Sequence, residues 1–209
     1  MHALLDHLQA VGFTAAPRVL GVADGWAKMV DPAGLKAAGR LLRDYHHAVA
    51  DWAPATPPVW FNGSTGTGGP DQVVCHGDFG PWNLVWQGLT PTGLLDWEYA
   101  APGPTSYDVY YAMQYVVPFR DDEECFRWLR YPSPPDRRAR AEIFAAAYGL
   151  DSLDGLVDQV IAVELQGLET VRRLAAEGHP RQVAALSDGL AETVRRQVAW
   201  AEAHRELFS

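Results

Sequence analysis

Residues 74–85 read VCHGDFGPWNLV, and after a turn residues 94–98 read LLDWE. The apolar run at 73–75 is typical of a short buried strand, which would deliver His76 and Asp78 to its end. Gly77 allows the backbone angles of a tight loop at that point. The stretch therefore predicts a buried strand that opens into a polar loop.

A hairpin is predicted directly after this loop. Residues 83–86 and 93–96 each favour a strand, and the turn-forming residues within 88–92 separate them. Because a hairpin brings the two ends of its strands together, we expect Asn83 and Asp96 to lie side by side.

The polar residues of this stretch have the spacing of a phosphoryl-transfer site. An Asp followed after four residues by Asn is the arrangement of a kinase catalytic loop, and Asp78 and Asn83 fit it. In such a loop the Asp receives the proton of the attacking hydroxyl and the Asn oxygen holds a metal ion. Asp96 would add a carboxylate, and Mg²⁺ prefers such oxygen ligands. Taken singly, Asp78 or Asp96 would more often cap backbone amides, but their joint spacing favours a site.

The chain resembles the aminoglycoside phosphotransferase family, which comprises small-molecule kinases with a protein-kinase-like fold. The family pattern is His-Gly-Asp, four residues, Asn, then an apolar pair with Asp, and later Gly-Pro and an Asp that opens a helix. This pattern is matched in order by residues 76–78, 83, 94–96, 103–104 and 107–109. Such a composite of intervals is far more specific than a single glycine motif.

The resemblance implies a role for each matched residue. Asp78 would be the catalytic base, and Asn83 and Asp96 would bind Mg²⁺. His76 would support the loop and Asp108 would anchor it from below. ATP would be the phosphate donor, and the family register places nucleotide binding at Met29 and Val30.

The N-terminal part is short for this family. Residues 1–11 predict an amphipathic helix, and residues 18–22 and 26–30 predict a strand pair around an Asp-Gly turn. In the family register these are the helix and the last two strands of the N-terminal lobe, so the first three strands and the phosphate-binding lysine are missing. Lys28 is interpreted as an exposed strand lysine. Either the assigned start lies too far downstream or the chain is naturally truncated.

The expected fold class is α+β. It is protein-kinase-like, with a mostly helical C-terminal lobe, a catalytic-loop hairpin and a residual N-terminal strand pair. We expect a residual N-lobe at 1–31 and a C-lobe at 32–209. The helix periodicity predicts a helix that begins at Asp31-Pro32, and two long helices at about 154–177 and 180–207.

Composition limits the classes of partner and compartment. The net charge of −9 argues against a nucleic-acid partner and is compatible with a cationic small-molecule substrate. Two cysteines are too few for a disulfide framework, and no membrane-length apolar run is present. These features predict a cytoplasmic protein without a membrane partner.

The acceptor site is less defined by the sequence. Glu98, Glu164 and Glu169 are candidate substrate-binding residues, although solvated glutamates on helices are common. The tyrosines at 107, 110, 111 and 115 favour buried core beneath the catalytic loop over an aromatic substrate cage. Aminoglycoside, other antibiotic, choline-like, sugar-amine and amino-alcohol acceptors all remain open.

The resulting hypothesis is an ATP-dependent small-molecule O-phosphotransferase. The main alternative is a truncated, non-catalytic, pseudokinase-like protein that binds a ligand or partner. A hydrolase or lyase that uses the same carboxylates is a third class. Because an isolated strand pair has an open edge, we expect a homodimer through the N-terminal remnant or weak local order there.

Overall fold

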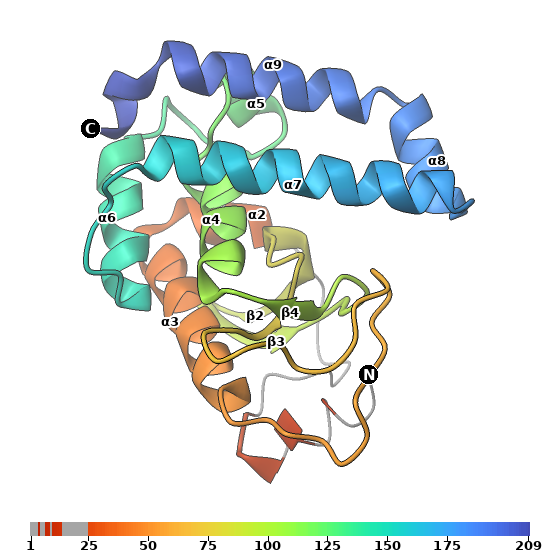
Figure 1. The fold of residues 1–209 in the computed structure, drawn as a ribbon. Helices are drawn as coiled ribbons and strands as arrows, with labels where there is room; N and C mark the ends of the chain where they lie inside the picture. Colours follow the sequence, from red (N-terminus) through yellow and green to blue (C-terminus); the bar gives the residue numbers. More distant parts are fainter. Residues whose placement is uncertain (1–3, 5–6, 9, 14–24) are drawn as a thin grey trace.

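The computed structural model describes residues 4, 7, 8, 10–13 and 25–209 (Figure 1). Its elements are α2 (Gly25–Val30), α3 (Pro32–Val49), β1 (Val73–Cys75), η1 (Pro81–Asn83), β2 (Leu84–Gln87), β3 (Thr90–Leu94), β4 (Ala101–Gly103), α4 (Thr105–Val116), α5 (Asp122–Arg127), α6 (Arg137–Tyr148), α7 (Leu156–Ala176), α8 (Pro180–Ser187), α9 (Leu190–Ala203) and η2 (Arg205–Phe208). Helices dominate and the sheets are small and antiparallel, which confirms the α+β class.

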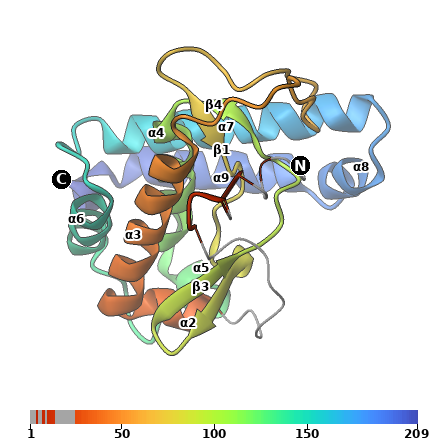
Figure 2. The same cartoon turned by 90° about the horizontal axis from the view of Figure 1, so that it is seen from below.

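Helix α3 begins where the sequence predicts. The Asp31 side chain caps it by accepting a hydrogen bond from the Ala33 amide, and Pro32 occupies the first turn. One face of α3 is buried along its whole length, from Leu35 to Val49. Figure 2 shows α3 lying between α6 and the strands, so this apolar face helps to form the central core.

Two small antiparallel sheets carry the polar loop. β1 pairs with β4, and β2 pairs with β3 as the predicted hairpin. The turn, however, is shorter than expected, because residues 90–92 belong to β3. Pro91 pairs with Trp86 beside a register shift, a position where a missing amide donor is tolerated.

The predicted strand at 26–30 is wrong, because these residues form helix α2. Trp26 and Val30 pack against a small cluster of Cys125, Leu129 and Tyr131, while Met29 enters the main core. The intervals of three and four residues from Trp26 to Met29 and Val30 fit a helix and not an alternating strand. The partner strand at 18–22 lies outside the described residues, so the homodimer inferred from an open edge of this pair stays a prediction.

The N-terminal helix is described only at residues 4, 7, 8 and 10, which are helical. Leu4, Leu8, Phe13 and Met29 belong to the same hydrophobic core as α3, α4 and α6. The division of the chain at residue 31 therefore stays a prediction.

The C-terminal helices form a layer over α4. Figure 1 shows α7 and α9 running side by side, with α8 joining them at one end. The single long helix predicted at 180–207 is wrong, because it is split between Ser187 and Leu190. Gly189 there has φ 92°, a left-handed conformation that a helix cannot continue through. Within the described part of the chain, no helix combines the length and the apolar character that crossing a membrane requires.

Arg140 joins three elements through backbone carbonyl groups. This buried side chain of α6 donates hydrogen bonds to Val116 O (2.7 Å), Val30 O (3.0 Å) and Met29 O (2.5 Å). It thereby satisfies acceptors at the ends of α2 and α4 that would otherwise be buried without donors.

We expect Arg140→Met to lower the free energy of unfolding by about 3 kcal/mol or more, because it leaves these carbonyl groups unsatisfied. Urea denaturation measures the change. Arg138→Met is the matched control on the same helix: Arg138 forms an exposed pair with Glu142, and its loss should change stability by less than about 1 kcal/mol. Equal effects of the two substitutions would contradict the role given to Arg140.

Candidate functional site

The polar loop is anchored by the buried Asp108 carboxylate of α4. Its Oδ2 accepts the His76 amide at 2.6 Å and contacts His46 Nε2 at 3.1 Å, while its Oδ1 accepts the Gly77 amide at 2.8 Å. Burial alone would raise the pKa of Asp108, but the hydrogen bond and charge of His46, with the Gly77 amide, outweigh burial and lower it. The carboxylate is therefore held ionised beneath the loop.

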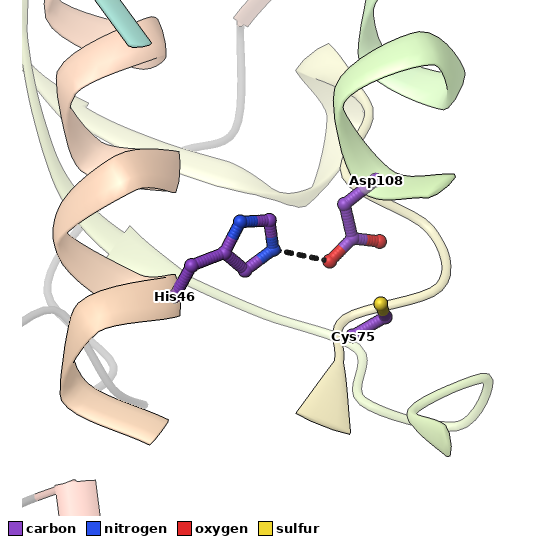
Figure 3. A group of neighbouring side chains, drawn as sticks. All are labelled: His46, Cys75 and Asp108. Atoms are coloured by element: carbon purple, nitrogen blue, oxygen red, sulfur yellow. Dashed lines mark hydrogen bonds and ion pairs between the residues drawn. The ribbon is translucent and has the colours of Figure 1, made fainter. Parts of the chain in front are cut away.

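His46, Cys75 and Asp108 come close enough to resemble a metal site. Figure 3 shows them converging from α3, the end of β1 and α4, and their ligand atoms lie within 4.8 Å of one another. Each side chain already has protein partners, however. Cys75 Sγ donates to Pro104 O, and His46 Nδ1 meets the Tyr148 hydroxyl at 2.8 Å. We interpret the cluster as the hydrogen-bonded support of the loop.

Gly77 and His76 shape the loop itself. Gly77 has φ 82°, and a Cβ there would lie 2.2 Å from Tyr99 O, so both the backbone angle and the available space require glycine. His76 is buried and its Nε2 lies 2.8 Å from Leu95 O, while its Nδ1 accepts the Asp78 amide at 3.2 Å. Burial lowers the pKa of His76, which favours the neutral ring that these bonds need. His76 thus links the loop to the segment that carries Asp96.

Three side chains orient the Asp78 carboxylate. Oδ1 accepts the Tyr111 hydroxyl at 2.5 Å, and Oδ2 accepts Asn83 Nδ2 at 2.8 Å and Trp82 Nε1 at 3.2 Å. The sequence motif does not identify Tyr111 and Trp82 as site residues. Tyr111 could have been found from its spacing, because it lies three residues after Asp108 and so on the same face of α4.

Asn83 and Asp96 lie on the two chain segments at the open end of the hairpin. Leu95 donates its amide to Asn83 O at 2.8 Å, which sets Asp96 next to Asn83 along the paired backbones. Asn83 Nδ2 also donates to the backbone carbonyl of Asp78, so its Oδ1 is the atom left for a ligand. Asp96 is exposed, with φ 56°, a left-handed conformation that Asp tolerates. One amide oxygen and one exposed carboxylate fit the oxygen ligands that Mg²⁺ prefers.

The other predicted site residues lie in different surroundings. Glu98 pairs with Arg181 of α8 at 3.0 Å. Glu169 has a 73% exposed side chain beside Arg172. Glu164 is buried in a pocket described below. The Met29 and Val30 carbonyl groups are occupied by Arg140, and nucleotide binding there stays a prediction.

The tyrosines of α4 differ from the buried core that the sequence favoured. All four are half-buried, and residues 107, 111 and 115 line a pocket between α4 and α7. Tyr110 packs against the main core instead. The pocket adjoins the loop, because Gly77 lines it too and Tyr111 contacts Asp78.

The chain is similar to known proteins over the loop and well beyond it. The family model described as "phosphotransferase enzyme family" matches residues 23–156, which include the whole loop and hairpin. The chain is also 30% identical over 182 residues to the trifolitoxin immunity protein of Rhizobium leguminosarum bv. trifolii, an alignment that covers 76% of this chain and 67% of that protein. The chain therefore belongs to the phosphotransferase enzyme family, the family that its His-Gly-Asp motif resembles.

Proposed function

We propose that the protein is an ATP-dependent O-phosphotransferase that acts on a hydroxyl group of a small molecule, with a protein-kinase-like arrangement of its catalytic lobe. The observation that carries this proposal is the position of Asp78. It stands in a loop held by Asp108, it accepts a hydrogen bond from Asn83, and it adjoins a pocket. Family membership supports the same class of reaction.

In the proposed reaction the protein supplies the base for one proton transfer. Asp78 accepts the proton of the acceptor hydroxyl while the new O–P bond forms and the bond from the γ-phosphorus to its bridging oxygen breaks. Asn83 Oδ1 and the Asp96 carboxylate would hold Mg²⁺, which supplies positive charge to the phosphate oxygens. Trp82 and Tyr111 orient the base for the acceptor hydroxyl.

A second candidate is a binding protein without turnover. The printed name of the relative assigns it an immunity function. A protein that phosphorylates a toxic molecule and one that only holds it would both protect a cell. Two observations favour the binding role: both Asp78 oxygens are occupied by protein donors, and Arg140 occupies the carbonyl groups at Met29 and Val30.

The base is tested by Asp78→Asn, which keeps the shape of the side chain and removes its basic oxygen. Turnover should fall by about 10²- to 10⁴-fold, while nucleotide affinity and thermal stability stay close to wild type. A coupled ATP-consumption assay over a panel of small alcohols measures turnover. Asp71→Asn, on an exposed position before β1, is the control. Full turnover in Asp78→Asn would exclude this mechanism, and no turnover of any acceptor in wild type would favour the binding role.

The metal pair is tested by Asp96→Ala. If Asn83 and Asp96 bind Mg²⁺, the metal should strengthen ATP binding in wild type, and the substitution should abolish that enhancement. Calorimetric titration with ATP, with and without Mg²⁺, measures it. An enhancement that survives unchanged in Asp96→Ala would remove Asp96 from the metal site.

The orientation of the base is tested by Tyr111→Phe, which removes only the hydroxyl that contacts Asp78. We expect kcat to fall roughly ten- to a hundredfold, because the base loses its fixed geometry. Tyr110→Phe, one position earlier on α4 and packed against the core, should leave kcat near wild type. If both variants behave alike, Tyr111 does not orient the base.

A further inference from the structure

Helix α2 lies directly against the loop that carries Asp78. Figure 2 shows α2 beside the hairpin of β2 and β3, and α2 also contacts η1, the turn that continues the loop. The two backbones come closest at Gly25, where an added Cβ would overlap Pro81 O. Because no side chain fits there, only glycine allows α2 and η1 to touch.

The next residue, Trp26, contacts the indole that binds Asp78. The ring centroids of Trp26 and Trp82 are 5.5 Å apart, and Trp82 Nε1 donates to Asp78 Oδ2 at 3.2 Å. Tyr115 of α4 lies 4.7 Å from the Trp82 ring, edge to face, and 6.4 Å from the Trp26 ring. The three rings form one cluster, so the Trp82 indole has an aromatic neighbour from α2 and another from α4.

Trp26 is itself fixed from the side that faces away from the loop. Together with Val30 it packs against the cluster of Cys125, Leu129 and Tyr131. The end of α2 is bound by Arg140, which donates to the carbonyl groups of Met29 and Val30. Closely packed side chains cannot shift independently, so a ring fixed in this way restricts the indole that it touches.

We propose that Trp26 is a positioning residue for the proposed phosphotransfer, because its ring holds the Trp82 indole in the orientation that donates to Asp78. The proposal rests on the proposed function for the role of Asp78 as the base, but the ring contact does not depend on nucleotide or turnover. Residues 25–30 then take part in the site although they lie about fifty positions before the His-Gly-Asp motif.

The first test measures the Trp82 indole in the full chain without nucleotide. Hydrogen exchange at its Nε1, followed by ¹⁵N NMR and assigned with Trp82→Phe, reports on the bond to Asp78. Trp26→Leu keeps an apolar side chain and removes the ring, so we expect this exchange to become at least about tenfold faster. Trp26→Phe keeps an aromatic ring and should return the rate to within about threefold of wild type.

A matched control separates positioning from a general loss of stability. Phe208→Leu also removes one ring from an aromatic pair, since Phe208 stacks on Phe119 at 4.1 Å near the C-terminus. It should lower thermal stability and leave the exchange of Trp82 at the wild-type rate. Unchanged exchange in Trp26→Leu, or an equal acceleration in Phe208→Leu, would overturn the proposal.

A second variant moves α2 without removing the ring. Gly25→Ala should push α2 away from Pro81 and accelerate the Trp82 exchange at least about tenfold, because the new Cβ overlaps the carbonyl oxygen. Gly69→Ala is its control, since a Cβ there would meet only Gln72 Oε1 at 4.0 Å. A folded Gly25→Ala with wild-type exchange would contradict the role of α2. The Trp26 variants decide the question if Gly25→Ala does not fold.

The reaction itself gives a further measurement, with Mg-ATP as the probe and water in place of the acceptor hydroxyl. Asp78 accepts the proton of water while the new O–P bond forms and the bond to the bridging oxygen breaks, which releases ADP and phosphate. In Trp26→Leu we expect kcat to fall roughly three- to tenfold and KM for ATP to stay within about twofold of wild type. Trp26→Phe should recover most of kcat.

Two results of this assay would count against Trp26. An equal fall of kcat in Phe208→Leu would assign its effect to stability, and a raised KM with unchanged kcat would assign it to nucleotide binding. Either result would overturn the proposal. If wild type hydrolyses no ATP, the proposed phosphotransfer loses its support, and the indole exchange alone decides whether Trp26 positions Asp78.

Discussion

The carboxylate of Asp108 receives the amides of His76 and Gly77, and the rest of the site depends on this interaction. A carboxylate with no exposed surface is costly unless donors surround it, and here the donors are two backbone amides and the His46 ring. Because those amides belong to the loop that carries Asp78, the requirement to satisfy Asp108 also sets the position of Asp78, the proposed base. The loop is therefore positioned by a buried charge more than by its own turn residues.

A second set of hydrogen bonds links the loop to the hairpin. His76 connects the loop to Leu95 O, and Asn83 connects it to Asp78 through both a backbone and a side-chain oxygen. Asp78 and Asn83, the proposed base and one proposed metal ligand, are thus joined directly by hydrogen bonds, and Asp96 follows Leu95, whose backbone bonds to both His76 and Asn83. A site of this kind is preorganised, because little rearrangement is needed before a ligand arrives.

The buried side chains of Asp108 and Asn83 differ from that of Glu164 in their hydrogen-bond partners. Asp108 and Asn83 are buried and their side chains are hydrogen-bonded within the protein, whereas the buried Glu164 has an oxygen, Oε1, with no hydrogen-bond partner among the described residues. Buried polar atoms without partners are rare in folded proteins, and each needs an explanation such as a water, an ion or a functional role. Sequence reasoning named Glu164 and Glu169 together, and burial separates them: one faces the pocket and the other faces solvent.

The sequence by itself determined the features that depend on local spacing. The capped start of α3, the strand before His76, the hairpin and the family motif could be read from it, because turns, caps and periodicities involve neighbouring residues. Only the tertiary structure decided that residues 25–30 form a helix, since Trp26 and Val30 take their packing partners from residues about a hundred positions later. It also decided that Tyr111 holds Asp78 and that Glu164 faces three tyrosines across a pocket. These last contacts join α4 to the loop and to α7. Local sequence patterns do not specify how elements that are distant in the chain pack against one another.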